Sequence, residues 1–130
     1  MTALVTGVTG FTGGHLARHL LHRGTAVRGL VRERSLARPE VAALRTAGVD
    51  IAPGDLTDAA AVAAACQGVD VVYHIAATYR EAGQPDSAYR AINVAGVQHV
   101  IDGARAAGAR RVVHCSTGGV HGHVAHPPAN

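Results

Sequence analysis

The stretch "LVTGVTGFTGGHL", residues 4–16, places four glycines between two apolar runs. Glycine weakens strands and helices alike, so such a cluster needs a local reason. Gly7, Gly10 and Gly13 form G-x-x-G-x-x-G directly after a predicted strand and at the start of a predicted helix. In that context the first glycine permits a tight turn, the second lets backbone N–H groups approach a pyrophosphate, and the third allows close packing of helix on strand. The helix N-terminus adds unpaired donors. The stretch therefore predicts a dinucleotide-binding loop.

Short apolar runs alternate with helical patterns along the rest of the chain. We predict strands over residues 2–6, 25–32, 48–55, 70–77 and 109–116, and helices over 12–22, 39–47, from Thr57 or Asp58 to Cys66, and 86–107. Residues 117–130 have the composition of a loop. This alternation indicates a parallel sheet with helices on both faces. The simplest arrangement with right-handed crossovers is an α/β, Rossmann-type doubly wound sheet of order 3-2-1-4-5, formed by one domain over residues 1–130.

Composition and charge exclude several classes of protein. The chain is 48% hydrophobic and 16% charged, with a net charge of +3, and its twelve basic residues are all arginines spread along the sequence. A nucleic-acid binder more often has a dense basic patch with aromatics. No apolar run approaches the ~18 residues of a membrane span. Cys66 and Cys115 lack the spacing of a disulfide scaffold or metal motif, so we expect a cytoplasmic protein without nucleic-acid or membrane partners.

The end of the second predicted strand bears on the choice of nucleotide. An acidic residue here would bind the adenosine ribose hydroxyls and indicate NAD. This chain has Arg32 instead, with Arg34 nearby and Glu33 between them. An arginine at this position can pair with a 2′-phosphate. The pattern favours NADP over NAD, with NAD still possible, and the alternative is an ordinary solvated turn.

Two more strand ends carry candidate cofactor contacts. In "GDLTD", Asp55 is placed to accept a hydrogen bond from an adenine amino group and Leu56 to pack on the ring; alternatively, Asp55 only caps the next helix. Ala76 and Ala77 follow the fourth strand, where small side chains let the backbone meet a ligand, although they would equally suit a core. Tyr79 either lines a substrate pocket or packs on the protein.

Several segments in the same order resemble one family. "TGVTGFTGGHL", "VRERS", "GDLTD", "YHIAA", "INVAGVQHVIDGA" and "RRVVHCSTGGVHG" resemble the extended short-chain dehydrogenases/reductases, which include the NAD-dependent epimerases and dehydratases. The sequence around "HIAATYR" and "VHG" is similar to the dihydroflavonol-reductase-like branch of this family. The resemblance covers nearly the whole chain and implies an enzyme that uses NAD(P) with a small-molecule substrate. It favours carbonyl reduction over epimerisation or dehydration.

The resemblance also implies roles for individual residues. Thr117 matches the catalytic Ser/Thr, whose hydroxyl orients the substrate oxygen. The expected cofactor-binding residues are Gly7, Thr9, Gly10, Phe11, Thr12, Gly13, Arg32, Asp55, Leu56, Ala76, Ala77, Thr78, Cys115 and Ser116. The family's catalytic Tyr-x-x-x-Lys is absent, because the chain contains no lysine. We therefore expect the cofactor half of an enzyme, ending before that motif and its substrate domain, and inactive alone. One alternative is a non-catalytic, dinucleotide-sensing or regulatory module, and another is a structural or interaction domain whose loop binds nothing.

The remaining residues suggest structural roles. His15, His19 and His22 are expected on an exposed helix face, and His74 and His114 as satisfied groups within buried strands. His121, His123 and His126 read H-x-H-x-x-H, but a flexible tail does not supply firm zinc geometry, so no metal is expected. Cys115 reads as a small buried residue. The 86–107 helix is apolar on more than one side, which predicts burial on both sides. The resemblance implies a homodimer there, and the alternative is contact with segments that this chain lacks. The fifth strand should be an edge that exposes apolar surface.

Overall fold

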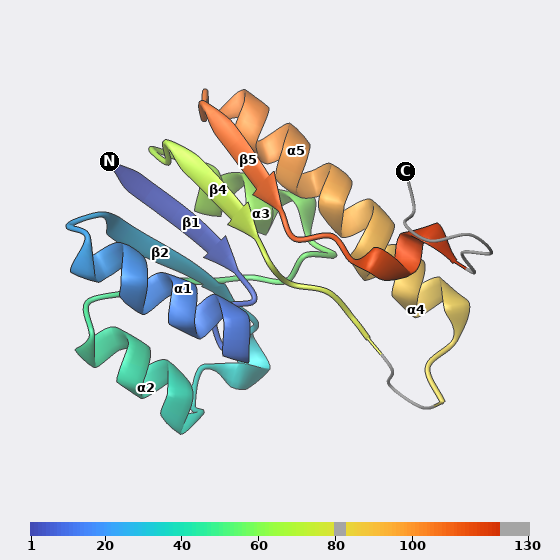
Figure 1. Cartoon of the computed structure of the whole chain (residues 1–130), viewed down its shortest axis with the longest axis horizontal. Helices are drawn as coiled ribbons and strands as arrows, with labels where there is room; N and C mark the ends of the chain where they lie inside the picture. The colour runs from blue at the N-terminus through green and yellow to red at the C-terminus, as the bar shows by residue number, and fades with distance from the viewer. Residues whose placement is uncertain (80–82, 123–130) are drawn as a thin grey trace.

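The computed structural model describes residues 1–79 and 83–122, and its centre is a parallel sheet (Figure 1). The strand order is β3-β2-β1-β4-β5. The strands are β1 (Thr2–Thr6), β2 (Ala26–Val31), β3 (Asp50–Pro53), β4 (Val71–His74) and β5 (Arg111–His114). This is the predicted doubly wound order. The chain leaves β1 toward β2 on one side and continues through β4 on the other, so the strand order reverses between β1 and β4.

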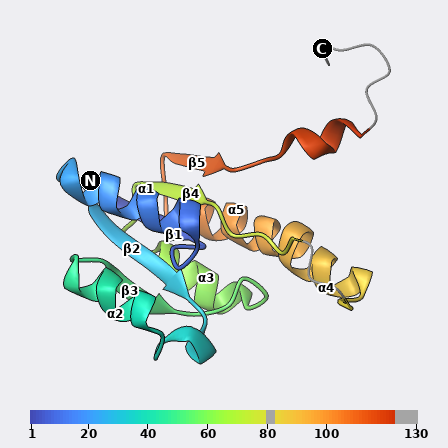
Figure 2. The same ribbon diagram turned by 60° about the horizontal axis from the view of Figure 1, so that its bottom comes forward.

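Helices cover both faces of the sheet (Figures 1 and 2). One face carries α1 (Phe11–His22) and α2 (Pro39–Thr46), and the other carries α3 (Ala59–Cys66) and α5 (Gly96–Ala106). Ala3 and Val5 of β1 belong to the core under α1 and α2, whereas Leu4 belongs to the core under α3 and α5. Successive side chains of a strand point to opposite faces. The central strand is therefore apolar on both sides.

A continuous helical run over residues 86–106 follows the predicted 86–107 helix. It comprises α4 (Asp86–Arg90), a π-helical segment η2 (Ala91–Ala95) and α5. The described structure buries one side of this run, and burial of the other side stays a prediction. Val100 of α5 is fully buried, but Val97 is half-buried and Val94 of the π-helical segment is 60% exposed, because the sheet and α3 contact one side of the run.

The first predicted strand has the observed bounds. The other four overran the observed strands by one to three residues at an end, because their apolar runs continue into loops beyond the ladder. The fifth strand is the edge that was expected, and Val112 and Val113 are 36% and 39% exposed. Burial of His114 was predicted wrongly, since all four residues of β5 are exposed. Residues Gly118–His121 form a short 3₁₀ turn, η3, where a loop was predicted. Within the described ranges, no helix is both long and apolar enough to cross a bilayer.

Candidate functional site

The glycine loop joins β1 to α1 and packs closely against the residues that follow β4. Gly7 has φ +68°, a left-handed conformation that favours glycine, and a Cβ there would lie 2.8 Å from the backbone nitrogen of Ala76. A Cβ on Gly13 would collide with the Gly7 carbonyl oxygen. The Gly10 N–H donates to that same oxygen at 3.0 Å. Gly10 is the N-cap and supplies no capping side chain, so the first N–H groups of α1 remain available to an anion.

A cavity of about 370 Å³ opens beside this loop, at the carboxyl ends of the strands. Its volume lies in the range of small-molecule sites. The loops after four strands line it, together with Ile92 of the π-helical segment. The lining residues are Thr6, Gly7, Thr9, Gly10, Phe11, Thr12, Gly13, Leu30, Val31, Arg32, Ser35, Gly54, Asp55, Leu56, Ile75, Ala76, Ala77, Thr78 and Ile92. The structure thus brings together twelve of the fourteen predicted cofactor residues, from the glycine loop, the ends of β2 and β3 and the segment after β4.

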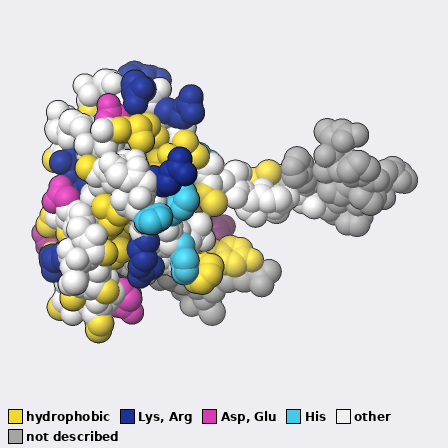
Figure 3. All heavy atoms as spheres, turned by 60° about the vertical axis from the view of Figure 1, so that its left-hand side comes forward, with side chains coloured by type: hydrophobic (Ala, Val, Ile, Leu, Met, Phe, Trp, Pro, Cys, Tyr) yellow, Lys and Arg dark blue, Asp and Glu magenta, His cyan; other side chains and the backbone are white. Residues whose placement is uncertain are grey.

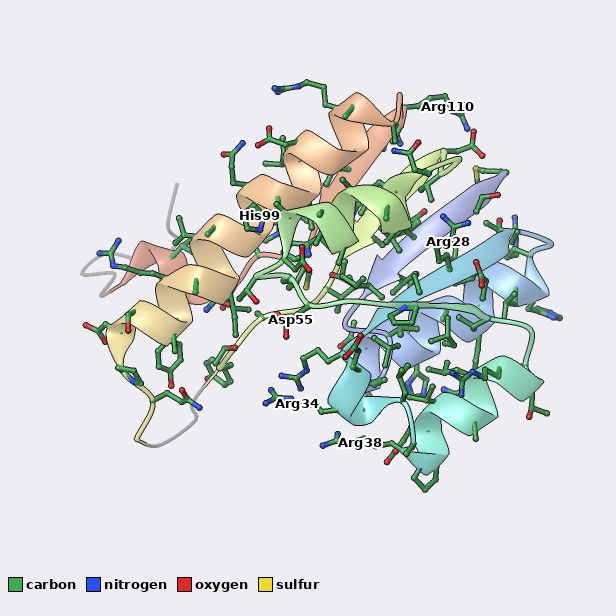
Figure 4. The ribbon with its side chains drawn as sticks, turned by 180° about the vertical axis from the view of Figure 1, so that it is seen from behind. Arg28, Arg34, Arg38, Asp55, His99 and Arg110 are labelled. Atoms are coloured by element: carbon green, nitrogen blue, oxygen red, sulfur yellow. The ribbon has the colours of Figure 1, made fainter. Side chains whose placement is uncertain are left out.

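Charged side chains gather where β2 and β3 end. Arg32 is exposed and lines the cavity, and Figure 4 shows Arg34 on the same side of the molecule as Asp55. Burial acts to raise the pKa of Asp55, but hydrogen bonds from the N–H and hydroxyl of Thr57, with the charges of Arg32 and Arg34, outweigh it and hold that pKa below its ordinary value. Asp55 is therefore an ionised acceptor at neutral pH.

The alternative that Asp55 only caps the next helix is wrong. The carboxylate of Asp58 is the N-cap of α3 and accepts from the N–H groups of Ala60 and Ala61 at 2.9 and 3.1 Å. Asp55 instead accepts from Thr57 within the loop and lines the cavity. Its side chain is thus placed by the loop rather than by the helix.

The wall after β4 is held by a residue that the sequence reasoning missed. The Asn93 side chain accepts from the Thr78 N–H and donates to the Thr78 carbonyl oxygen, each at 2.9 Å. Ile92, beside Asn93, lines the cavity directly. His99 lies further along the same helical run, in α5, and its Nδ1 is 2.7 Å from the Leu56 carbonyl oxygen. The run over residues 86–106 therefore contacts two walls of the cavity.

Three predicted site residues follow β5 and lie apart from this group. Cys115, Ser116 and Thr117 are all exposed, and none of them is among the described residues that line the cavity. Burial of Cys115 was predicted wrongly, because it lies past the end of an edge strand. Figure 2 shows the segment after β5 running away from the sheet. Thr117 Oγ1 accepts the Gly119 N–H at 3.2 Å.

The histidines have mixed outcomes. His15, His19 and His22 are exposed on α1 as predicted, and Figure 3 shows histidine and arginine side chains gathered on one face. His74 is buried, but its Nε2 has no hydrogen-bond partner among the residues that the structure describes, so the expectation of a satisfied core group is wrong. His123 and His126, of the H-x-H-x-x-H pattern, lie outside the described residues. Tyr79, which was expected either to line a substrate pocket or to pack on the protein, is 72% exposed.

The strand order, the two helical layers and the glycine loop define the Rossmann class of α/β folds. A sequence profile described as "NAD dependent epimerase/dehydratase family" matches residues 3–130. The chain belongs to this family, which confirms the resemblance that its motifs predicted.

Curated relatives and solved structures agree with this assignment. Sterol demethylase protein B of Methylococcus capsulatus is 42% identical over 122 residues, covering 94% of this chain and 36% of that protein. The 2-alkyl-3-oxoalkanoate reductase of Stenotrophomonas maltophilia is 41% identical over 127 residues, covering 98% and 36%. A short-chain dehydrogenase/reductase superfamily protein from Agrobacterium tumefaciens, solved with bound NAD, is 34% identical with a TM-score of 0.78, covering 94% of this chain and 34% of that one. The chain thus spans about a third of the length of these relatives.

Proposed function

We propose that the chain binds NADP as the cofactor part of an oxidoreductase that reduces a carbonyl group in a small-molecule substrate. The observation that carries this proposal is the fit of the glycine loop to a phosphate group. Neither Gly7 nor Gly13 has room for a Cβ, and the loop leads directly into the uncapped N-terminus of α1. Such a backbone cradle with free N–H groups suits a pyrophosphate.

The other cavity residues suit the remaining parts of a dinucleotide. Asp55 offers an ionised acceptor to an adenine amino group, and the buried Leu56 offers an apolar surface to the ring. Arg32 lies at the end of β2, where its guanidinium can pair with a 2′-phosphate. Ala76, Ala77 and Thr78 form the wall assigned to the nicotinamide end. When bound, the cofactor supplies hydride transfer.

Carbonyl reduction is favoured over epimerisation by the relatives' names. Two of them are a 2-alkyl-3-oxoalkanoate reductase and a putative dihydroflavonol 4-reductase of Synechocystis. The proposed role of Thr117 is to orient the substrate oxygen. Because Thr117 Oγ1 already accepts the Gly119 N–H, its hydroxyl hydrogen is left to donate to that oxygen. Dimerisation through the 86–107 helix stays a prediction.

The test is a calorimetric titration of the protein with NADPH and with NADH. We expect tighter binding of NADPH, and we expect Arg32→Asp to weaken NADPH binding by about 10- to 100-fold, the range of one charge-assisted contact, while NADH binding changes little. Arg45→Asp is the matched control, because Arg45 is an exposed arginine on α2 away from the cavity lining. Equal losses for the two nucleotides, or for the two variants, would remove Arg32 from the 2′-phosphate site.

A further inference from the structure

The polar cluster behind the cavity wall consists of Thr6 at the end of β1 and His74 at the end of β4. Thr6 Oγ1 lies 2.7 Å from His74 Nδ1. The same oxygen lies 3.2 Å from the backbone nitrogens of Ile75 and of Ala76. Thr6 and His74 are 0% and 1% exposed. One buried hydroxyl thus joins two neighbouring strands at the point where the strand order reverses.

The donors and acceptors in this cluster can be assigned by counting. A hydroxyl oxygen has two lone pairs and one hydrogen. The N–H groups of Ile75 and Ala76 occupy both lone pairs, so the hydroxyl hydrogen points to His74 Nδ1. Nδ1 is then the acceptor and carries no proton. The proton of neutral His74 sits on Nε2, the buried nitrogen that has no partner in the described structure.

The cluster is connected to the cavity through the backbone that it holds. Thr6, Ile75 and Ala76 all line the cavity. Ala76 lies against Gly7, whose missing Cβ would come within 2.8 Å of the Ala76 nitrogen. A shift of Ala76 therefore moves it against, or away from, the glycine loop. His74 itself does not line the cavity, so any effect on a ligand acts through Thr6.

We propose that neutral His74 is a positioning residue, which orients the Thr6 hydroxyl and thereby fixes the Ile75–Ala76 wall of the cavity for the dinucleotide. The assignment to a dinucleotide rests on the proposed function above. The unpartnered Nε2 supports a positioning role, because leaving a buried donor unpaired costs free energy that a purely structural residue would not need. An apolar side chain would fill the same space without that cost.

Protonation of His74 would undo the arrangement. A proton on Nδ1 would point at an oxygen whose lone pairs are already occupied, so one wall N–H would lose its acceptor. The titratable groups on the elements packed here are His114 of β5, whose ring stacks at 5.3 Å, Cys66 of α3 and His99 of α5, which is engaged with Leu56. Burial first, and His114 second, lower the pKa of His74 to about 4. The proposal therefore predicts that nucleotide affinity falls as the solution is acidified toward this value.

The first experiment needs no ligand. Nitrogen NMR of the imidazole rings at neutral pH should show His74 with an unprotonated Nδ1 and a protonated Nε2. Amide hydrogen exchange should show the N–H groups of Ile75 and Ala76 protected in the wild type and in Thr6→Ser, which keeps the hydroxyl, and less protected in Thr6→Val. The opposite tautomer, or equal protection in both variants, would overturn the proposal.

The second experiment measures NADPH affinity against pH. Thr6→Val and His74→Phe should each weaken binding by about three- to ten-fold at neutral pH, the range of one hydrogen bond, and the double variant should lose no more than either single one. Thr6→Ser should restore most of the affinity, and both single variants should lose the acid dependence. His19→Phe, at an exposed position on α1, is the matched control. Additive losses with an unchanged pH profile would contradict the proposal.

If the wild type binds neither nucleotide, the proposed function fails. The tautomer of His74 and the amide exchange of Ile75 and Ala76 then decide whether His74 positions the Thr6 hydroxyl.

Discussion

At the scale of single residues, contacts rather than backbone conformation require glycine at position 13 of the phosphate loop. Gly13 has no room for a Cβ because the Gly7 carbonyl oxygen occupies that space. The obstacle is backbone, which cannot rotate away as a side chain can. The loop and the first turn of α1 would have to move apart to accept any larger residue.

We predict that Gly13→Ala lowers the free energy of unfolding by about 1–3 kcal/mol, the usual range for overpacking, and removes nucleotide binding. Gly118→Ala is the control, because an added Cβ there would meet nothing within 4 Å. Urea unfolding followed by circular dichroism measures both variants. Similar stabilities for the two variants would show that the crowding at Gly13 is relieved at little cost.

At the scale of elements, Arg28 of β2 ties the end of α3 to the sheet. Its Nη1 donates to the carbonyl oxygens of Ala65 and Gln67 at 2.9 and 2.8 Å, and its Nε donates to Asp50 at 2.9 Å. The Asp50 side chain is 67% exposed, whereas that of Arg28 is 25% exposed. An exposed ion pair adds little to the free energy of unfolding, but hydrogen bonds from a charged donor to the carbonyl groups at a helix end add more.

We therefore predict that Arg28→Met lowers the free energy of unfolding by about 2 kcal/mol, and that Asp50→Asn lowers it by less than about 1 kcal/mol. Chemical denaturation of the two variants beside the wild type gives both values. Equal losses would mean that Arg28 stabilises the fold through its ion pair with Asp50 rather than through the carbonyl contacts at the end of α3.

The sequence predicted the elements better than the contacts between them. Apolar periodicity and glycine spacing are local signals, so the strand order and the phosphate loop were predictable. The bonds of Asn93 to Thr78 and of His74 to Thr6 join residues 15 and 68 positions apart, and no local pattern marks them. The exposure of Cys115 was missed for a related reason: "RRVVHCS" reads as a buried strand, and only its place at the sheet edge makes it exposed.

At the scale of the whole molecule, His74 makes stability depend on pH. Its pKa is about 4 in the folded protein, whereas the ordinary value for histidine, which applies to the unfolded chain, is 6.5. The unfolded chain therefore binds more protons between these values, so stability is highest above about pH 6.5 and falls as the pH falls toward 4. The difference in pKa corresponds to a loss on the order of 3 kcal/mol. The lowered pKa of Asp55 acts in a more acidic window, below its ordinary 3.8.

Urea unfolding at several pH values between 7 and 4 measures this dependence. We expect the decline in the wild type and a flatter profile in His74→Phe, which has no group to protonate at this position. A wild-type profile that is level from pH 6.5 to 4.5 would show that His74 is protonated in the folded protein without cost.

The measurement that tests the central claim most directly is mapping of backbone amide shifts while NADPH is added to the protein. If the cavity is the dinucleotide site, the largest changes will fall on Gly10–Gly13, Arg32, Asp55 and Ala76–Thr78, the residues that line it. Changes confined to other surfaces, or no changes at saturating nucleotide, would contradict the account.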